Sequence, residues 1–97
     1  MTPETVLDEA ARLTSADRQE NYDHPTRNMG RTAAMWAAFL GVPITPRQVA
    51  VCMVLVKVAR EAHVPKRDNL VDIAGWARVA EMTEEERDAA IAAKGAK

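Results

Sequence analysis

The sequence contains little of what builds disulfides, β-sandwiches or membrane spans. Only 4% of its 97 residues are aromatic, and Cys52 is the single cysteine. One cysteine excludes a disulfide or a cysteine metal site within one chain. The longest apolar run, Val49 to Val56, is far too short to span a membrane. We therefore expect no membrane partner, and alanine, valine and methionine in place of aromatics favour helix packing over a β-sandwich.

The charge balance and the first residues exclude two further classes. The formal net charge is −1, so the chain has no basic excess of the kind that duplex nucleic acid attracts. The opening "MTPETVLDEA" has neither the basic nor the apolar region of a secretion signal. We expect a cytoplasmic protein that does not bind duplex nucleic acid.

Helix signals recur along the whole chain. Thr2-Pro3 suits a helix start, Thr45-Pro46 another, and Gly41 a helix end. Thr83 followed by Glu86 reads as a capping box. Apolar residues at steps of three and four predict helices at about 3–13, 29–40, 46–62 and 68–82, with a short one from 83.

These signals predict an all-α fold, a compact bundle of four main helices plus a short C-terminal helix. We expect one domain over 1–97, with its core at about 3–82 and a tail at 83–97. The third helix is apolar on every side from Val49 to Val56, which predicts that it is the central, buried one.

The stretch "DRQENYDHPTRN", residues 17–28, is too polar for the helices around it. Arginine forks suit phosphate oxygens, so Arg18 is a candidate phosphate ligand. Tyr22 can stack on a base, and Asn28 can read a base edge or hold the loop. His24 precedes a proline and therefore favours extended backbone; a turn role, a ligand role and proton donation all stay open for it. We interpret this loop as part of a site for a phosphate-bearing molecule.

Four charged residues form a second group. Lys57 and Arg60 share one face of the third helix, and Asp68 and Asp72 share one face of the fourth. Charges at the edge of a core need partners, so the four fit an internal ion-pair network. The same cations could also bind phosphate while the carboxylates orient them. Asp68 alone fits a helix N-cap equally well.

Several motifs in order resemble a family of small phage and prophage proteins of unknown function. They are "DRQENYDHPTRN", "MWAAFLG", "ITPRQVAVCMVLVKVAR" and "DNLVDIAGWARVA", within about residues 7–80. Where such proteins have glycine after the tyrosine, this chain has Asp23. The resemblance implies a protein of the cytoplasm of an infected or lysogenic bacterium.

That family is in turn distantly similar to the all-α nucleotide pyrophosphohydrolases of the MazG type. Those enzymes hold Mg²⁺ between an E-x-x-E pair and an E-x-x-D pair, and the metal activates water. Here "KVAR", with Lys57 and Arg60, stands in the place of the first pair. The resemblance makes Asp68 and Asp72 candidate metal ligands, and Mg²⁺ is the cofactor that this chemistry would use.

Three hypotheses follow from the sequence. The first is a nucleotide-binding protein without catalysis, which holds a nucleotide or an immune signalling nucleotide through Arg18, Tyr22, His24, Asn28, Lys57 and Arg60. The second is a Mg²⁺-dependent nucleoside triphosphate pyrophosphohydrolase, and the third is a helical protein-interaction module. We prefer the first, leave open whether the protein is an enzyme, and expect a homo-oligomer because so short a chain covers little apolar surface.

Overall fold

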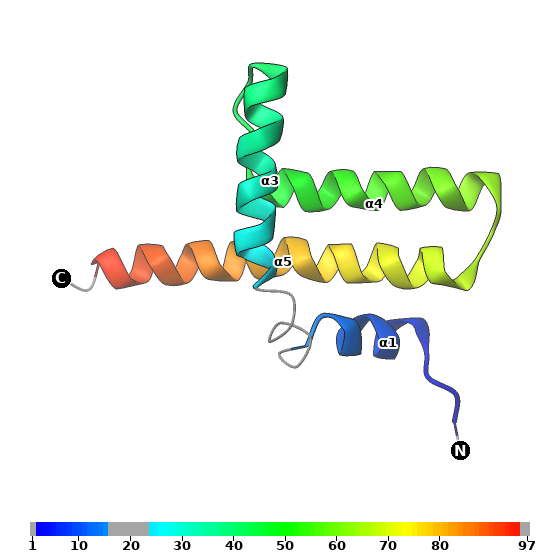
Figure 1. Ribbon diagram of the computed structural model, residues 1–97. Coiled ribbons are helices and arrows are strands. Elements are labelled where there is room, and N and C mark those ends of the chain that lie inside the picture. The colour runs from blue at the N-terminus through cyan, green and yellow to red at the C-terminus, as the bar shows by residue number, and fades with distance from the viewer. Residues whose placement is uncertain (1, 16–23, 96–97) are drawn as a thin grey trace.

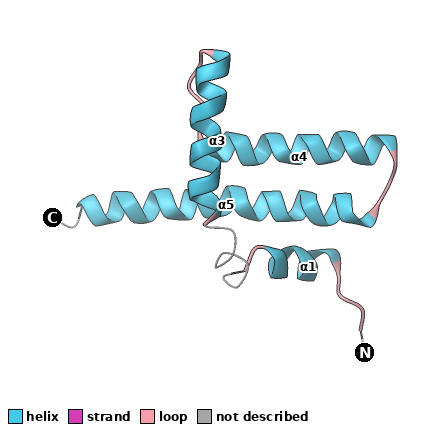
Figure 2. Ribbon diagram, viewed as in Figure 1, coloured by secondary structure: helices cyan, strands magenta, loops and turns pink. Residues whose placement is uncertain are grey.

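The computed structural model describes residues 2–15 and 24–95, and all regular structure in these ranges is helical (Figures 1 and 2). The helices are α1 (Val6–Leu13), α3 (Pro25–Leu40), α4 (Pro46–His63) and α5 (Arg67–Gly95). The predicted all-α class is therefore confirmed. Within the described ranges, no helix has both the length and the apolar character needed to cross a membrane.

Local capping chemistry sets most helix ends. Thr45 Oγ1 accepts a hydrogen bond from Gln48 N at 3.1 Å, and the Gln48 side chain accepts one from Thr45 N at 2.9 Å. This reciprocal capping box starts α4 where the sequence predicts it. Gly41 ends α3 in the left-handed conformation, with φ 72°. For α1 the predicted start was early, because Thr5 rather than Thr2 is its N-cap.

The predicted short C-terminal helix is wrong as a separate element, because α5 runs unbroken from Arg67 to Gly95. Thr83 lies inside it, and its hydroxyl donates to Ala80 O at 2.7 Å instead of capping a new helix. Thr83 and Met82 are both buried, and Thr26 Oγ1 at the start of α3 donates to Met82 O at 3.5 Å. Burial of Met82 and Thr83 thus keeps α5 helical through the position where the Thr83 capping signal predicts a new helix.

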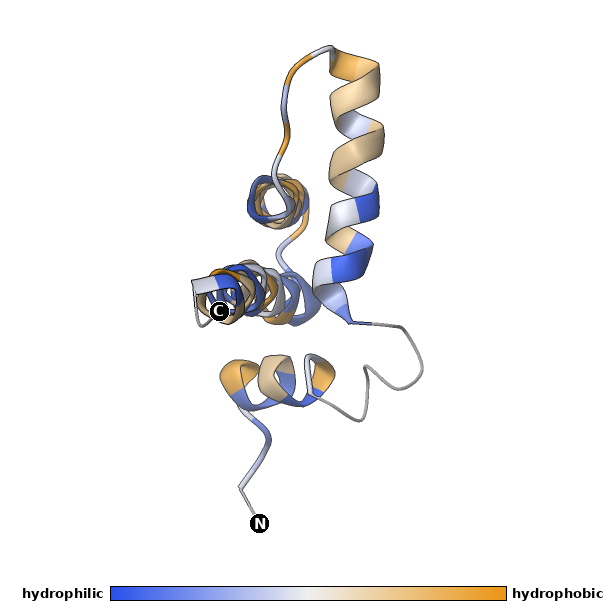
Figure 3. Cartoon of the chain, turned by 90° about the vertical axis from the view of Figure 1, so that its left-hand side faces the viewer, coloured by the Kyte–Doolittle hydropathy of each residue, from blue (hydrophilic) through white to orange (hydrophobic). Residues whose placement is uncertain are grey.

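Three of the described helices form one layer, and the fourth, α3, crosses it. α4 and α5 run antiparallel side by side, α1 lies on the other side of α5, and α3 crosses one face of this layer (Figures 1 and 3). The molecule measures 50 × 36 × 21 Å, and its radius of gyration of 15.2 Å exceeds the ~13 Å typical of 100 residues. The predicted compact bundle is therefore not confirmed.

The core lies where α3 crosses α4 and α5. Trp36, Ile44 and Trp76 are partly buried and pack against it. The core itself comprises six buried side chains: Met29, Ala33, Val49, Ala50, Val79 and Ala80. The prediction that α4 is the central helix is wrong. The helix that packs against all the others is α5, and α4 leaves Val51, Leu55 and Val58 exposed on its outer face.

Polar contacts fix the turn between α4 and α5. Glu61 Oε1 accepts hydrogen bonds from Lys66 N at 2.9 Å and from Asn69 Nδ2 at 3.1 Å. Asn69 is buried and also donates to Val64 O at 3.3 Å. These bonds close the connection and set the register of α5 against α4.

Exposed ion pairs attach α1 to the start of α5. Arg67 pairs with Glu9 and also donates to Glu4 O at 2.9 Å. Arg12 pairs with Glu4 at 3.0 Å, and this guanidinium holds the pKa of the Glu4 carboxyl below its ordinary value of 4.5. The attachment of α1 thus depends on charges in water.

Candidate functional site

The predicted ligand residues fall in separate parts of the molecule. Arg18 and Tyr22 lie outside the described residues. His24 and Asn28 stand at the start of α3. The remaining four belong to the far ends of two helices: Lys57 and Arg60 to the C-terminal part of α4, and Asp68 and Asp72 to the first turns of α5.

One ion pair of the predicted network is present. Lys57 Nζ lies 3.1 Å from Asp72 Oδ2, with the lysine side chain only 16% exposed and the aspartate 39%. Arg60 and Asp68 are both exposed, and no ion pair among the described residues includes either of them. Lys57 and Asp72 therefore join α4 to α5, as the structural interpretation of these charges predicts.

The start of α3 and the Lys57–Asp72 pair are far apart along α5. Thr26 contacts α5 at Met82, whereas Lys57 contacts it at Asp72. Ten residues separate these two points, which is about 15 Å of helix. His24 and Asn28 therefore do not surround one compact site with Lys57 in a single chain.

His24 has a structural role that the sequence left open. It is the N-cap of α3, and its Nδ1 accepts a hydrogen bond from Thr26 N at 3.1 Å. Pro25 follows as the first helical residue, where its missing N–H leaves no hydrogen bond unmade. Asn28 is exposed one turn into the helix. The predicted helix start at about 29 is therefore wrong by one turn, because residues 25–28 of the predicted polar loop already belong to α3.

A groove opens beside this helix start. Its volume is about 470 Å³, within the usual range of small-molecule pockets. We call it the central groove, and its lining comes from the starts of α3 and α4 and from the middle of α5: Thr26, Thr45, Pro46, Arg47, Thr83, Glu84, Glu86, Arg87 and Ala90. Two helices begin at it, so two positive dipole ends lie at one cavity.

Two arginines of the central groove hold one carboxylate. Glu84 lies 3.4 Å from Arg47 Nη1 and 3.8 Å from Arg87 Nη1. The two arginine side chains are 60% and 71% exposed, so each pair is weak in water. Sequence reasoning missed these arginines because Glu84 and Arg87 were assigned to a separate short helix. The signal that could have found Arg47 is its position directly after the Thr45-Pro46 start.

A second cavity, of about 380 Å³, separates α1 from α5. Small and apolar side chains line most of it, and Arg78 is the one charged residue among the described residues of its lining. That arginine already pairs with Glu81 at 2.6 Å and with Glu85 at 2.8 Å. Its charge is thus balanced within α5.

The described residues provide few ligands for a metal. No group of three or more His, Cys, Asp or Glu side chains that could hold a metal ion occurs in residues 2–15 and 24–95. Asp72 is engaged by Lys57, and Asp68 is exposed one turn earlier. Asp68 and Asp72 as Mg²⁺ ligands therefore stay a prediction, and the described part of the chain adds no third ligand to them.

Comparison with known proteins agrees with the phage resemblance. Residues 5–84 match a family described as "Domain of unknown function (DUF6378)". The "Gene 55 protein" of Mycobacterium phage D29 is 37% identical over 84 residues, and that of Mycobacterium phage L5 is 38% identical over 88. Each match covers 86% of this chain but 56% of the relative, so the chain spans little more than half of their length. No solved structure gives a significant match.

Proposed function

The chain belongs to the DUF6378 family, and we propose that it binds a phosphate-bearing small molecule, a nucleotide, in the central groove. The observation that carries the proposal is the meeting of two helix starts and two arginines at one cavity. Helix N-termini favour anions through their dipoles. Arginine adds forked donors that fit phosphate oxygens.

Glu84 gives this groove a way to exchange anions. Its carboxylate is the anion that Arg47 and Arg87 hold in the described structure. Both contacts are longer than a good charged hydrogen bond of ~2.8 Å. A phosphate group carries more charge and more acceptor oxygens than a carboxylate. It can therefore replace Glu84 between the two guanidinium groups while Glu84 turns to water.

The sequence of the polar loop supports the same location. Tyr22 stands two residues before His24, the N-cap of α3, and Arg18 stands six residues before it. In the sequence, these predicted ligand residues directly precede the helix start that borders the central groove. In this proposal Arg47 and Arg87 bind phosphate, and the loop supplies the contacts to the base.

The pyrophosphohydrolase alternative needs a cluster of acids around Mg²⁺. Asp68 and Asp72 are its candidates here, and Asp72 has a lysine as its neighbour. A nearby cation competes with a metal ion for the same carboxylate, which favours binding over catalysis in this chain. The activity of the longer Gene 55 proteins is a separate question, because the match leaves much of their length uncovered.

Calorimetric titration with nucleoside triphosphates and pyrophosphate, with and without Mg²⁺, tests the proposal. Arg47→Gln and Arg87→Gln should each weaken binding about 10- to 100-fold, since a hydrogen bond to a charged group contributes ~1.5–3 kcal/mol. Arg60→Gln is the matched control, because Arg60 is an exposed arginine of α4 outside the groove.

Each outcome of this titration has one meaning. If Arg60→Gln abolishes binding and the groove variants do not, the site lies at the end of α4, as the sequence predicted, and the groove proposal is wrong. Absence of binding to the unsubstituted protein refutes the proposal as a whole. Recovery of pyrophosphate only when Mg²⁺ is present would establish the enzymatic alternative.

A further inference from the structure

Most of the exposed large apolar side chains of the described residues belong to α3, to α4 and to the segment between them. The last turns of α3 and the segment Gly41–Thr45 project past the outer edge of α4 (Figure 1). We call this projection the arm. Figure 3 shows that the arm is the hydrophobic end of α3, while the end of α3 at α5 is hydrophilic. Phe39 on the arm is 89% exposed, more than any other large apolar side chain of the described residues.

The stripe that builds the core of α3 continues onto the arm. Met29, Ala33 and Trp36 pack in or against the core. Leu40 extends the same stripe by one further step of four, but it is exposed because α3 has passed beyond α4 there. The spacing of a buried stripe therefore continues onto a part of α3 where Leu40 is exposed.

The outer face of α4 repeats this situation. Val51, Leu55 and Val58 follow each other at steps of four and three and are all exposed, Leu55 by 62%. This is the spacing of a helix that packs along another helix. The neighbouring positions Cys52 and Ala59 are uncharged, whereas Arg47 stands one turn before Val51 on the same side of α4.

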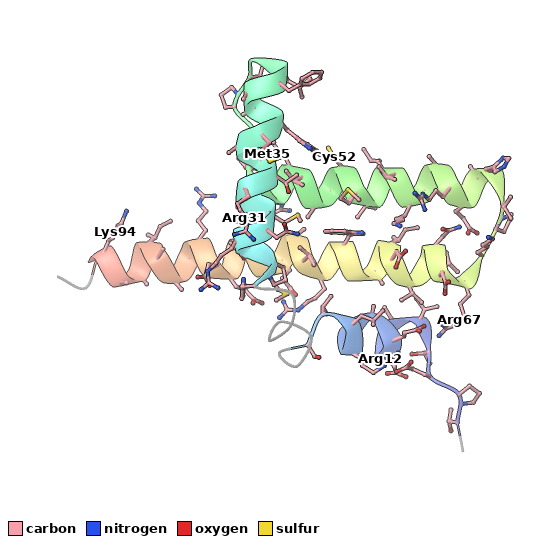
Figure 4. All side chains as sticks on the ribbon, in the orientation of Figure 1. Arg12, Arg31, Met35, Cys52, Arg67 and Lys94 are labelled. Carbon is pink, nitrogen blue, oxygen red and sulfur yellow. The ribbon has the colours of Figure 1, made fainter. Side chains whose placement is uncertain are left out.

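The arm and this face adjoin. Figure 4 places Met35 on α3 and Cys52 on the nearby first turns of α4, at the corner between the two helices. We call the whole surface the apolar corner: Met35, Phe39, Leu40, Val42, Val51, Leu55 and Val58. It shares no residue with the central groove.

The size of the apolar corner fits a homodimer. A fully exposed large apolar side chain presents roughly 100 Å², and the seven residues are between 45% and 89% exposed. Together they offer on the order of 400 Å² of apolar surface. A standard interface takes ~800 Å² from each partner, somewhat more than half of it apolar. The radius of gyration, large for this chain length, is a further sign of missing partner contacts.

We propose that two copies of this chain pair through the apolar corner. The outer faces of α4 pack antiparallel about a twofold axis near Leu55. Val51 of one copy then lies close to Val58 of the other. Each arm then lies against the end of the other copy's α4. A second copy is the occupant that fits, because the stripe is symmetric about Leu55 and a twofold interface must be self-complementary.

Light scattering coupled to gel filtration tests this pairing. The chain has a mass of 10.7 kDa, and the unsubstituted protein should elute with twice that mass at micromolar concentrations and above. Leu55→Lys and Phe39→Lys should each restore the monomer mass, since a charge would be buried at the interface. Both residues are exposed in the single chain, so circular dichroism should show an unchanged helix content.

Ile91→Lys is the matched control, because Ile91 is 57% exposed on α5 and lies outside the apolar corner. It should leave the dimer intact. A monomer mass for the unsubstituted protein overturns the proposal. A dimer that Ile91→Lys disrupts and that Leu55→Lys and Phe39→Lys leave intact overturns it equally.

The single cysteine tests the antiparallel geometry. Pairing about Leu55 places Cys52 of each copy opposite position 58 of the other, so the two thiols are offset by about 9 Å along the helix axis. Packed helix axes lie ~8–10 Å apart, so the full separation of the thiols is roughly 12–13 Å. A bis-maleimide of that reach should join two chains, and Leu55→Lys should abolish the product. Efficient dimer formation without any cross-link would refute the α4 pairing.

Discussion

Removing either partner of the Lys57–Asp72 pair should destabilise the protein, and the two losses should be unequal. Lys57 is 16% exposed and Asp72 is 39% exposed. Asp72→Asn leaves an ammonium group mostly buried without its carboxylate. Lys57→Met keeps the apolar stem in place and leaves an aspartate that water can reach. We therefore expect Asp72→Asn to be the more damaging change.

The magnitude follows from the partial burial of the pair. Breaking a fully buried pair costs ~3–5 kcal/mol, whereas exposed pairs contribute ~0.2–1 kcal/mol. The exposure of Asp72 places this pair between the two limits, near the lower one. We expect Asp72→Asn to cost about 1–2 kcal/mol and Lys57→Met less than about 1 kcal/mol. The double variant should cost less than the sum of the two single variants, because the pair is lost only once.

Urea unfolding of both single variants and the double variant measures this coupling as a double-mutant cycle. All proteins are compared at one concentration, because self-association would change the apparent stability. The more exposed Arg78–Glu85 pair serves as a control and should give a smaller coupling. A coupling of zero for Lys57 and Asp72, together with loss of nucleotide binding in both single variants, would refute the structural role and favour the ligand role.

Three further predictions concern stability. Gly75→Ala should stabilise the protein by about 0.5–1 kcal/mol, since a Cβ there meets, among the described residues, only Thr14 Cγ2 at 4.0 Å. Gly41→Ala should destabilise it by about 1 kcal/mol, because the φ of Gly41 is 72°. Thermal melting that ranks the two variants the other way contradicts this. Asn69→Ala should cost about 1–3 kcal/mol in urea unfolding, since the buried amide closes the α4–α5 turn, and a neutral result would show that water replaces it. The lowered pKa of Glu4 means that its stabilisation is present above pH 4.5 and is lost as pH falls through the folded-state pKa, so Glu4→Gln should flatten the acid limb of stability against pH, and an unchanged limb would contradict the pairing.

Local chemistry predicted most helix ends correctly. Gly41 ends α3 and Thr45 caps α4 where the sequence placed them, because capping needs only residues within one turn of each other. Thr2 and Thr83 are exceptions, since Thr5 caps α1 and Thr83 lies inside α5. The capping signal of Thr83 contributes ~1 kcal/mol, and burial of the surrounding turns of α5 against α3 outweighs that.

The candidate site was harder to predict than the helices. The sequence identified the polar loop and four charges, but it could not place the loop relative to Lys57 or find Arg47 and Arg87 across the central groove. Those relations depend on how α3 crosses α5, which no local pattern encodes. The same holds for the choice of Asp72 rather than Asp68 as the partner of Lys57.

By itself the sequence determined that this protein is helical, where most helices begin and end, and that its family is one of phage proteins. Only the tertiary structure decided that α5 rather than α4 is central, and that α4 presents Leu55 to water. The physical reason is the range of the forces. Capping and periodicity act within one or two turns of a helix, whereas burial depends on which helices meet. An apolar face therefore has the same sequence pattern whether its partner lies in the same chain or in a second copy.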